Sequence, residues 1–278
     1  MFAYVKCVRT TVLTCLLLVS VNAQTPSRQS TTDNEYQTGA ILWQQSSAEY
    51  RALAFQAFSL AQLRLDQDLA QHRSRRGRSM RPAIVVDSDE TVLDNTRFQA
   101  ELILRGVAYT PQSWTAWCER AEAGAVPGAV EFLNYAFRHG VRVFYITNRR
   151  QTEKAGTVAN LKKLGFPDVS DETVMIREQG TTPSKESRRQ NVRSHYRIVL
   201  LMGDNLNDFN DDFAGKSIAD RKAQVDRERV EFGSQYIVLP NPMYGDWEGA
   251  IYGNAANDSE RRERRRAALQ GITVQPGP

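Results

Sequence analysis

Ile84-Val85-Val86-Asp87-Ser88-Asp89-Glu90-Thr91 joins a short apolar run to two acidic residues that stand one position apart. Alternate residues of an extended chain share a face, so Asp87 and Asp89 are expected to point the same way just beyond a strand end. Two carboxylates this close repel each other unless a cation or a proton resolves the conflict. The stretch therefore predicts a strand that ends in a catalytic pair, although Asp in a turn also serves as a simple backbone cap.

Apolar runs and helical patterns alternate after this first predicted strand, 83–86. The further strands are predicted at 141–146, 173–176, 197–202 and 236–239, and the helices at 129–139, 152–164 and 184–195. This alternation favours an α/β fold, with a mostly parallel sheet and helices on both faces. Ligands of such sheets bind beyond the carboxyl ends of the strands, so the chemical residues are expected to follow the apolar runs.

Polar residues do follow these predicted strands. They are Asp87 and Asp89 after the first, Thr147, Asn148 and Arg149 after the second, Lys185 after the third, and Asp204 and Asp208 after the fourth. Four segments of the chain thus bring acids, a hydroxyl and a cation to one predicted edge. Singly, Thr147 also reads as a strand-end hydrogen bond and Lys185 as an ordinary surface lysine.

Acidic residues around one point suggest a hard divalent cation with oxygen ligands, most simply Mg²⁺. We predict Asp87, Asp89, Asp204 and Asp208 as its ligands. A metal, the Thr147 hydroxyl and the Lys185 ammonium would together hold a phosphate group. The matching reaction is phosphoryl transfer through an aspartyl-phosphate. Asp87 would attack phosphorus, and Asp89 would protonate the leaving alkoxide and then deprotonate water.

The first 23 residues have the features of an export signal. Lys6 and Arg9 precede a mostly apolar run at 12–21, and 21–23 offers small residues for cleavage. The apolar run is short for a membrane span, so an uncleaved anchor is the minor alternative. We therefore expect a periplasmic or secreted protein without a stable membrane anchor after cleavage. Cys118 would then be the one cysteine left, and its apolar surroundings suggest a buried residue rather than a nucleophile.

The 278 residues, with 41% hydrophobic and 24% charged content, fit a soluble globular protein. We predict an N-terminal helical segment at 24–80, helical from about 39 to 72, a core at 81–240, and a C-terminal extension at 241–278 that packs with the helical segment and ends in a basic tail. The net charge of +4 stems largely from arginine clusters at 73–78 and 261–266. Such runs are usually solvated, the second as a helix or a tail, so a nucleic-acid polymer is not the expected partner.

These motifs resemble the haloacid dehalogenase superfamily, and within it the class C acid phosphatases, the lipoprotein e family of 5'-nucleotidases. The blocks that carry the resemblance are 43–46, 49–53, 87–91, 125–129, 147–149, Lys185, 203–208 and 241–249. The resemblance implies a Rossmann-like core with a small helical domain, Mg²⁺ dependence, and hydrolysis of phosphomonoesters, often nucleotides, outside the cytoplasm. The sequence departs from the family pattern in two places. Ser88 stands where an apolar residue is usual, and the lipid-attachment cysteine is absent.

The resemblance also assigns residues. It implies that the metal contacts the carboxylates of Asp87 and Asp204 and the backbone carbonyl of Asp89. It implies that Trp114 and Tyr244 hold a nucleoside between their rings, for which packing in the core is the plain alternative. Substrate contacts are predicted for these two aromatic residues and for Asn148 and Arg149.

Two other functions stay open on the sequence. One is phosphotransfer to a nucleoside or alcohol instead of water, and the other is phosphate binding without catalysis on the same fold. The expected partner in the main hypothesis is a small phosphomonoester. The preferred nucleotide and the oligomeric state, a homodimer included, are not fixed by these motifs.

Overall fold

The computed structural model describes residues 34–72 and 80–269, and all of these belong to one structural unit. The predicted signal peptide at 1–23, the first arginine cluster at 73–78 and the last part of the C-terminal tail lie outside the described residues. Among residues 34–72 and 80–269, no helix is both long and apolar enough to cross a membrane.

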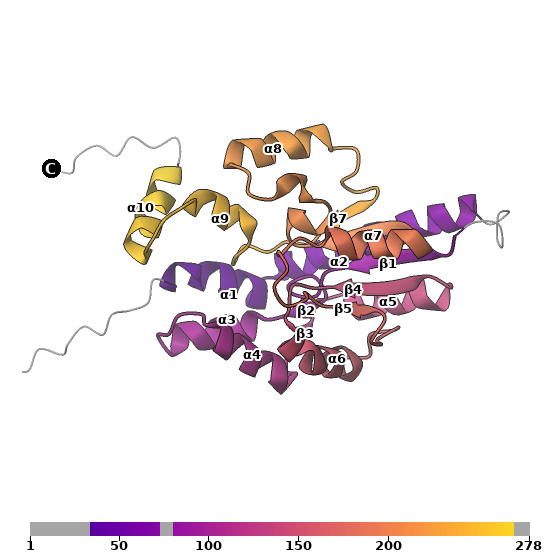
Figure 1. Ribbon diagram of the computed structural model, residues 1–278, viewed down its shortest axis with the longest axis horizontal. Coiled ribbons are helices and arrows are strands. Elements are labelled where there is room, and N and C mark those ends of the chain that lie inside the picture. Colours follow the sequence, from indigo (N-terminus) through magenta and orange to yellow (C-terminus); the bar gives the residue numbers. More distant parts are fainter. Residues whose placement is uncertain (1–33, 73–79, 270–278) are drawn as a thin grey trace, which may run out of the picture. The chain divides into compact units, whose positions relative to one another are not determined.

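Five strands form one parallel sheet in the order β5-β4-β1-β6-β7 (Figure 1). They are β1 (Pro82–Val86), β4 (Arg142–Ile146), β5 (Val174–Met175), β6 (Arg197–Gly203) and β7 (Tyr236–Val238). The predicted strands are all present, and the predicted α/β fold with its parallel sheet is confirmed. At the end of β1, Val86 pairs with Tyr145 of β4 and Met202 of β6, so the three central strands end at one edge.

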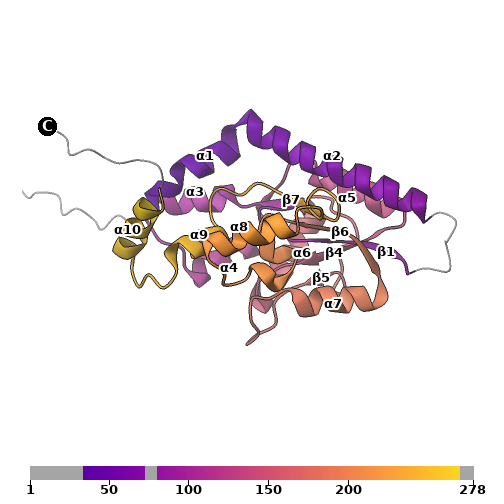
Figure 2. The ribbon, with the colours of Figure 1, turned by 90° about the horizontal axis from the view of Figure 1, so that it is seen from above.

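The side chains of β1 alternate between two apolar cores. Ile84 and Val86 pack in the core that is completed by α2 (Ala48–Gln71), α5 (Ala129–Arg138) and α6 (Lys154–Lys163). Ala83 and Val85 pack in a second core with Val192 of α7 (Glu186–His195). Figure 2 shows α2 and α5 on one side of the sheet and α7 on the other. Burial on both faces explains why the strand reads as an unbroken apolar run.

The predicted N-terminal helix is interrupted. It consists of α1 (Thr38–Ser46) and α2, which are separated at Ser47. Ser47 has an extended backbone with ψ of 138°, and its hydroxyl accepts a hydrogen bond from the Tyr50 backbone N at 3.0 Å. A serine at this position caps the new helix, which is why the predicted helical segment consists of two helices.

Several elements were not predicted from the sequence. They are η1 (Glu35–Gln37), α3 (Thr96–Leu104), α4 (Pro111–Arg120), η3 (Gln151–Glu153), η4 (Leu206–Asp208), η5 (Asp211–Phe213), α8 (Ile218–Arg227), α9 (Asp246–Tyr252) and the antiparallel pair β2 (Leu93–Asp94) and β3 (Gly124–Ala125). The second arginine cluster, at 261–266, for which a solvated helix or a tail is expected, lies in a helix, α10 (Asp258–Ala268).

The C-terminal extension contacts the start of the helical segment. Gln37 donates its Nε2 to the Met243 carbonyl at 2.9 Å. The guanidinium of Arg265 lies over the Tyr36 ring, 3.8 Å from its centroid. These contacts join η1, which directly precedes α1, to α10 and to the segment before α9, and Figure 1 and Figure 2 show α9 and α10 at the same end of the molecule as α1.

Candidate active site

The predicted polar residues meet at one edge of the sheet. Asp87 directly follows β1, and its backbone N donates to the Met202 carbonyl at 2.9 Å, so the ladder with β6 holds this residue in place. Thr147 directly follows β4, and Asp204 directly follows β6. Lys185 directly precedes α7. The carboxyl ends of three strands and the start of one helix thus surround one point.

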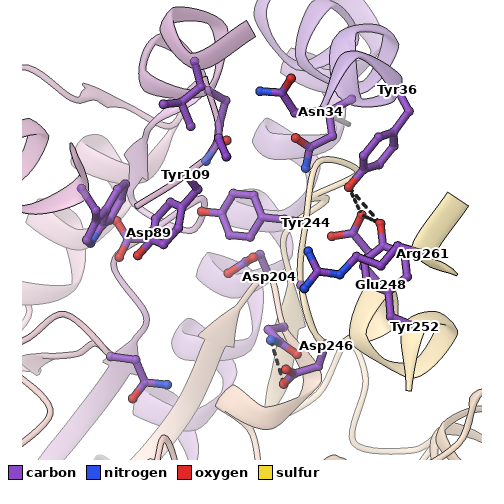
Figure 3. Close-up of a pocket in the computed structure, with 18 of the residues that line it drawn as sticks. Asn34, Tyr36, Asp89, Tyr109, Asp204, Tyr244, Asp246, Glu248, Tyr252 and Arg261 are labelled. Carbon is purple, nitrogen blue, oxygen red and sulfur yellow. Dashed lines mark hydrogen bonds between the residues drawn. The ribbon is translucent and has the colours of Figure 1, made fainter. Parts of the chain in front are cut away.

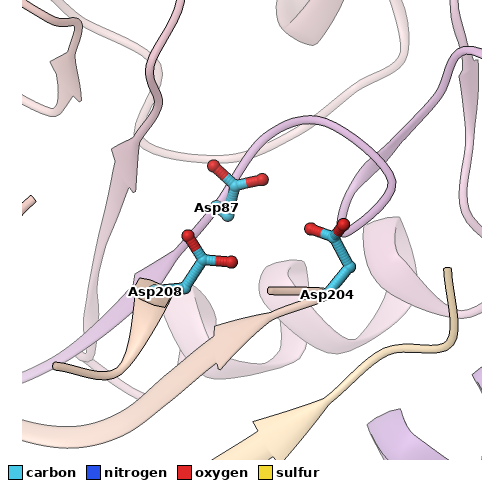
Figure 4. Close-up of side chains that lie close together, drawn as sticks. All are labelled: Asp87, Asp204 and Asp208. Carbon is cyan, nitrogen blue, oxygen red and sulfur yellow. The ribbon is translucent and has the colours of Figure 1, made fainter. Parts of the chain in front are cut away.

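Asp87, Asp204 and Asp208 form an acidic cluster (Figure 4). One carboxylate oxygen from each lies within 4.8 Å of the others. A cation bonded at about 2.1–2.5 Å joins oxygens that are up to about 4–5 Å apart, so one ion can reach all three. A set made only of carboxylate oxygens suits a hard divalent cation.

Burial of this cluster opposes its negative charge. Burial raises the pKa of Asp87 to about 7; Lys185 acts against this rise, while the carboxylates of Asp208 and Asp89 add to it. Burial, with the nearby Asp208 and Asp87 carboxylates, also raises the pKa of Asp204 well above its usual range. Three carboxylates this close repel one another when ionised, so a positive charge between them would stabilise their ionised form.

Lys185 supplies part of that positive charge. Its Nζ donates to Asp208 Oδ1 at 2.6 Å and also to Asp87 Oδ1, and its side chain is 6% exposed. Burial alone would lower its pKa, but the Asp208 and Asp87 carboxylates outweigh that effect and the pKa of Lys185 is raised. The alternative of an ordinary surface lysine does not hold, because the ammonium is buried between two acids.

Close packing fixes Asp208 in the cluster. Its Oδ2 accepts the Asn205 backbone N at 3.1 Å. A Cβ at Gly203 would lie 2.5 Å from the Asp208 Cβ, so no larger residue fits at position 203 without displacing the acid. Arg189, which is fully buried, donates its Nη1 to the carbonyls of Asn207 and Asp208, each at 3.1 Å.

Two polar side chains hold Asp204. Asn241 donates its Nδ2 to Asp204 Oδ2 at 2.8 Å, and the Thr91 hydroxyl donates to Oδ1 at 3.1 Å. Thr91 belongs to the loop after β1, and Asn241 belongs to the segment after β7. Asp204 is therefore anchored from both sides of β6.

Asp89 directs its carboxylate away from the acidic cluster. Arg149 donates its Nη2 to Asp89 Oδ1 at 2.7 Å, Asn95 donates its Nδ2 to Oδ1 at 2.9 Å, and the Thr147 hydroxyl lies 3.5 Å from Oδ2. This corrects the expectation that four acidic side chains surround one ion, because the Asp89 carboxylate is taken up by Arg149. The metal contact that the resemblance gives to the Asp89 backbone carbonyl stays a prediction.

The segment after β4 is built around Thr147, Asn148 and Arg149. Thr147 is buried, and its Oγ1 accepts the Arg149 backbone N at 3.2 Å. Asn148 is exposed at the pocket, and its Nδ2 donates to the Pro183 carbonyl at 2.8 Å. Arg188, in the first turn of α7, donates to the Thr147 carbonyl at 2.5 Å and to Asn148 Oδ1 at 2.8 Å. Arg188 thereby joins this segment to the helix that carries Lys185.

A pocket with a volume of about 780 Å³ opens above these groups (Figure 3). Its lining includes Asp87, Asp89, Asn148, Arg149, Lys185, Asp204 and Asp208, together with the aromatic residues Tyr36, Tyr109, Trp114, Tyr244 and Tyr252. The site is thus a charged floor with aromatic walls, which is a usual composition for a small-molecule site.

The two aromatic residues predicted to contact substrate both line this pocket. Trp114 packs edge-on against Phe98, with ring centroids 5.2 Å apart, and the Arg149 guanidinium lies 5.2 Å from its ring centroid. Tyr244 donates its hydroxyl to the buried carboxylate of Glu90. Trp114 is thus held by its packing against Phe98 and Tyr244 by its hydrogen bond to Glu90, and both rings line the pocket.

Sequence reasoning missed the groups behind the site. Glu90 and Asn95 are fully buried, and Asn95 contacts both Glu90 and Asp89. Asn95 Oδ1 also accepts the Trp117 indole N–H at 2.8 Å. A glutamate directly beside the second acid was visible in the sequence, but its hydrogen bond with Tyr244, which lies 154 residues away, was not.

The outer end of the pocket was also not predicted. Tyr36 and Tyr252 both donate their hydroxyls to Glu248 Oε1. In Figure 3, Arg261 extends from α10 toward the same pocket. Cys118, in contrast, is buried as predicted, and burial raises the pKa of its thiol to about 12, which disfavours the reactive thiolate.

Known proteins share this family and fold. Residues 11–247 match the family model described as HAD superfamily, subfamily IIIB (Acid phosphatase). The class C acid phosphatase structure from Bacillus anthracis is 40% identical, covers 87% of this chain and 99% of its own, and superposes with a TM-score of 0.80. A second structure of that enzyme, with tungstate bound, is likewise 40% identical, covers 86% and 98% of the two chains, and has a TM-score of 0.80.

Curated relatives are more distant. The Stem 31 kDa glycoprotein of Glycine max is 27% identical over 56% of each chain. Acid phosphatase 1 of Solanum lycopersicum is 26% identical over 58% of this chain and 57% of its own. The match therefore spans little more than half the length of these relatives. Since the family model covers most of the sequence, the chain belongs to the subfamily IIIB acid phosphatases of the HAD superfamily.

Proposed function

We propose that this protein is a Mg²⁺-dependent acid phosphatase that hydrolyses phosphomonoesters, with nucleoside 5'-monophosphates as preferred substrates. The proposal rests chiefly on one observation. Asp87, Asp204 and Asp208 share a buried cluster with Lys185 at the carboxyl edge of the sheet, in a chain of this family. The related class C acid phosphatase of Bacillus anthracis has been solved with bound tungstate, an oxyanion, and this likeness supports a phosphate ester as substrate.

Asp87 is the proposed nucleophile. A carboxylate oxygen of Asp87 would form a bond to phosphorus while the bond between phosphorus and the ester oxygen breaks. The ammonium of Lys185 and the hydroxyl of Thr147 would hold the phosphoryl oxygens, on which negative charge spreads during transfer. The Lys185 ammonium contacts the Asp87 carboxylate directly, so it lies beside the proposed nucleophile.

Asp89 is the proposed proton donor and acceptor. It would give a proton to the leaving alkoxide, and would later take a proton from the water that attacks phosphorus and releases inorganic phosphate from Asp87. Its carboxylate lines the pocket with Asp87, yet lies outside the acidic cluster. That separation suits two acids with different tasks.

The donor set fits a magnesium ion. Asp87, Asp204 and Asp208 offer oxygen ligands alone, and burial raises the pKa of Asp87 and of Asp204 even with Lys185 beside them. A bound Mg²⁺ would neutralise charge on the phosphoryl oxygens and keep Asp87 ionised. Asp204 and Asp208, fixed by Asn241 and Asn205, are the side chains we expect to hold it.

The aromatic walls favour a substrate with a flat leaving group. Trp114 and Tyr244 line the same pocket as the acids, and its volume of about 780 Å³ leaves room beyond a phosphate group. A nucleoside base offers a flat face on which aromatic rings stack. We also propose that the protein acts in the periplasm or outside the cell, on the basis of the signal-like residues 1–23.

A panel of nucleoside, aryl and alkyl monophosphates, assayed across pH with and without chelator, tests this function. We expect phosphate release that is fastest on the acid side of pH 7, that is lost on chelation, and that returns with Mg²⁺. No release from any ester, or release that a chelator leaves unchanged, would refute the proposal. Excess nucleoside or alcohol in the same assay separates hydrolysis from phosphotransfer, because transfer yields a new phosphate ester.

A further inference from the structure

Glu90 is an unusual residue for the position it occupies. Its side chain is fully buried and its backbone has φ of 57°, in the left-handed region that residues with a side chain rarely adopt. It belongs to a tight loop after β1, in which the Ser88 carbonyl accepts the backbone N of Leu93 at 2.8 Å. Strained backbone of this kind persists where surrounding contacts determine it, and it is frequent at functional sites.

The Glu90 carboxylate contacts one residue of its own loop region and one distant residue. Oε1 accepts the Asn95 backbone N at 2.9 Å, and Oε2 accepts Asn95 Nδ2 at 3.3 Å and the Tyr244 hydroxyl. Asn95 Nδ2 also donates to Asp89 Oδ1 at 2.9 Å. A continuous set of hydrogen bonds thus runs from Tyr244 through Glu90 and Asn95 to Asp89.

This path joins two groups that face the substrate. Asp89 and Tyr244 line the pocket, whereas Glu90 and Asn95 are not among its lining residues. Tyr244 comes from the segment after β7, and Glu90 comes from the loop after β1. The contact therefore fixes one aromatic wall of the pocket relative to the acid that is expected to serve the leaving group.

We propose that Glu90 is a positioning residue: its hydrogen bonds fix the position of the Tyr244 ring relative to the Asp89 carboxylate. This fixed spacing would favour phosphomonoesters with a planar leaving group. This rests on the proposed phosphatase function. A planar group stacked on Tyr244 would bring its ester oxygen to Asp89, whereas a small alkyl group gains nothing from the ring. Geometric alignment of this kind is worth large factors in rate.

The test compares Glu90→Gln, Tyr244→Phe and the double variant on two substrates, a nucleoside 5'-monophosphate and glycerol phosphate. Tyr135→Phe is the matched control, since its hydroxyl also donates to a carboxylate, that of Asp66 at 2.6 Å, but outside the pocket lining. Thermal unfolding checks that each variant folds. Tyr244→Phe leaves the buried acid intact, so it carries the test even where Glu90→Gln fails to fold.

Each single change is expected to lower kcat/KM for the nucleotide by roughly tenfold, mainly through kcat, and by less than threefold for glycerol phosphate. The double variant should lose no more than the worse single variant, because both changes break one path. Equal losses on both substrates, or losses that multiply in the double variant, would overturn the positioning role. A wild-type protein inactive on both substrates would instead refute the phosphatase function, and this inference with it.

Discussion

The guanidinium of Arg149 contacts both carboxylate oxygens of Asp89, through Nη2 to Oδ1 at 2.7 Å and Nε to Oδ2 at 3.2 Å. Arg149 is itself buried, and its Nη1 donates to the Thr157 hydroxyl at 3.0 Å. A planar fork with two bonds sets the direction of the carboxylate as well as its place. The residue that follows Thr147 by two positions thus orients the proposed acid and base.

Arg149→Lys should therefore lower kcat more than it raises KM. A lysine keeps the charge but cannot make the two parallel bonds, so Asp89 would lose its fixed direction. We expect kcat to fall by about 10–100-fold, within the range of general acid–base effects. Steady-state kinetics measure this. Arg120→Lys is the control, because Arg120 also makes two bonds to a carboxylate, that of Glu101, at the surface. If Arg149→Lys lowered kcat as little as Arg120→Lys, the two bonds from Arg149 would not be what orients Asp89.

Asp89→Asn should affect substrates according to their leaving groups. An asparagine cannot donate the proton that an alkoxide needs, whereas p-nitrophenolate leaves without one. We expect kcat to fall by about 10²–10⁴-fold for an alkyl or nucleoside phosphate and by clearly less for p-nitrophenyl phosphate. Parallel assays on the two esters check this. The same loss for both would assign Asp89 a role other than leaving-group protonation.

Gly203→Ala should destabilise the protein because the new Cβ would lie 2.5 Å from the Asp208 Cβ. Overpacking of this kind costs about 1–3 kcal/mol in the free energy of unfolding. Gly249→Ala, in α9, is the control, since a Cβ there meets nothing within 4 Å. Chemical unfolding of both variants gives the comparison. Equal stability of the two would mean that Asp208 is not packed against β6 as described.

Mg²⁺ should raise the unfolding temperature more at pH 7 than at pH 5. The raised pKa of Asp87, about 7, means that the metal-free folded protein holds a proton that the unfolded chain releases near pH 4. The free energy of unfolding therefore falls as pH rises from about 4 to about 7, and a cation restores it by replacing the proton. At 100 times its Kd the ion adds about 2.7 kcal/mol.

This stabilisation corresponds to a rise of roughly 5–10 °C for a chain of this size. Thermal unfolding at the two pH values, with Mg²⁺ or with chelator, measures it. Asp204→Asn should abolish most of the rise, while Asp226→Asn, on the exposed part of α8, should keep it. A rise that is larger at pH 5 would contradict the link between proton and metal.

Much of the fold could be read from the sequence because its signals are local. The apolar runs of β1, β4 and β6 and the residues that follow them gave both the parallel sheet and the edge where the site lies. Helix α4 went unpredicted although Thr110 and Ser113 form a capping box at its start and Pro111 is its first residue. That signal is short, and the helix that follows it has only 10 residues.

The details of the site depended on contacts between distant segments. The sequence placed Asp89 beside Asp87, but its orientation depends on Arg149, 60 residues further on. The Glu90 carboxylate likewise accepts a hydrogen bond from Tyr244, which is 154 residues away. Residue type and spacing predict which groups reach a site, whereas the direction of each side chain is set by partners that no local pattern reveals.

The shared acidic cluster is tested most directly by crystals soaked in Mn²⁺, which binds the same oxygen ligands as Mg²⁺ and scatters X-rays anomalously. We predict one strong anomalous peak bonded to carboxylate oxygens of Asp87 and Asp204, with Asp208 bonded directly or through water, and no peak in Asp204→Asn crystals. A peak elsewhere, or none at this cluster in the unaltered protein, would contradict the metal site on which the proposed reaction depends.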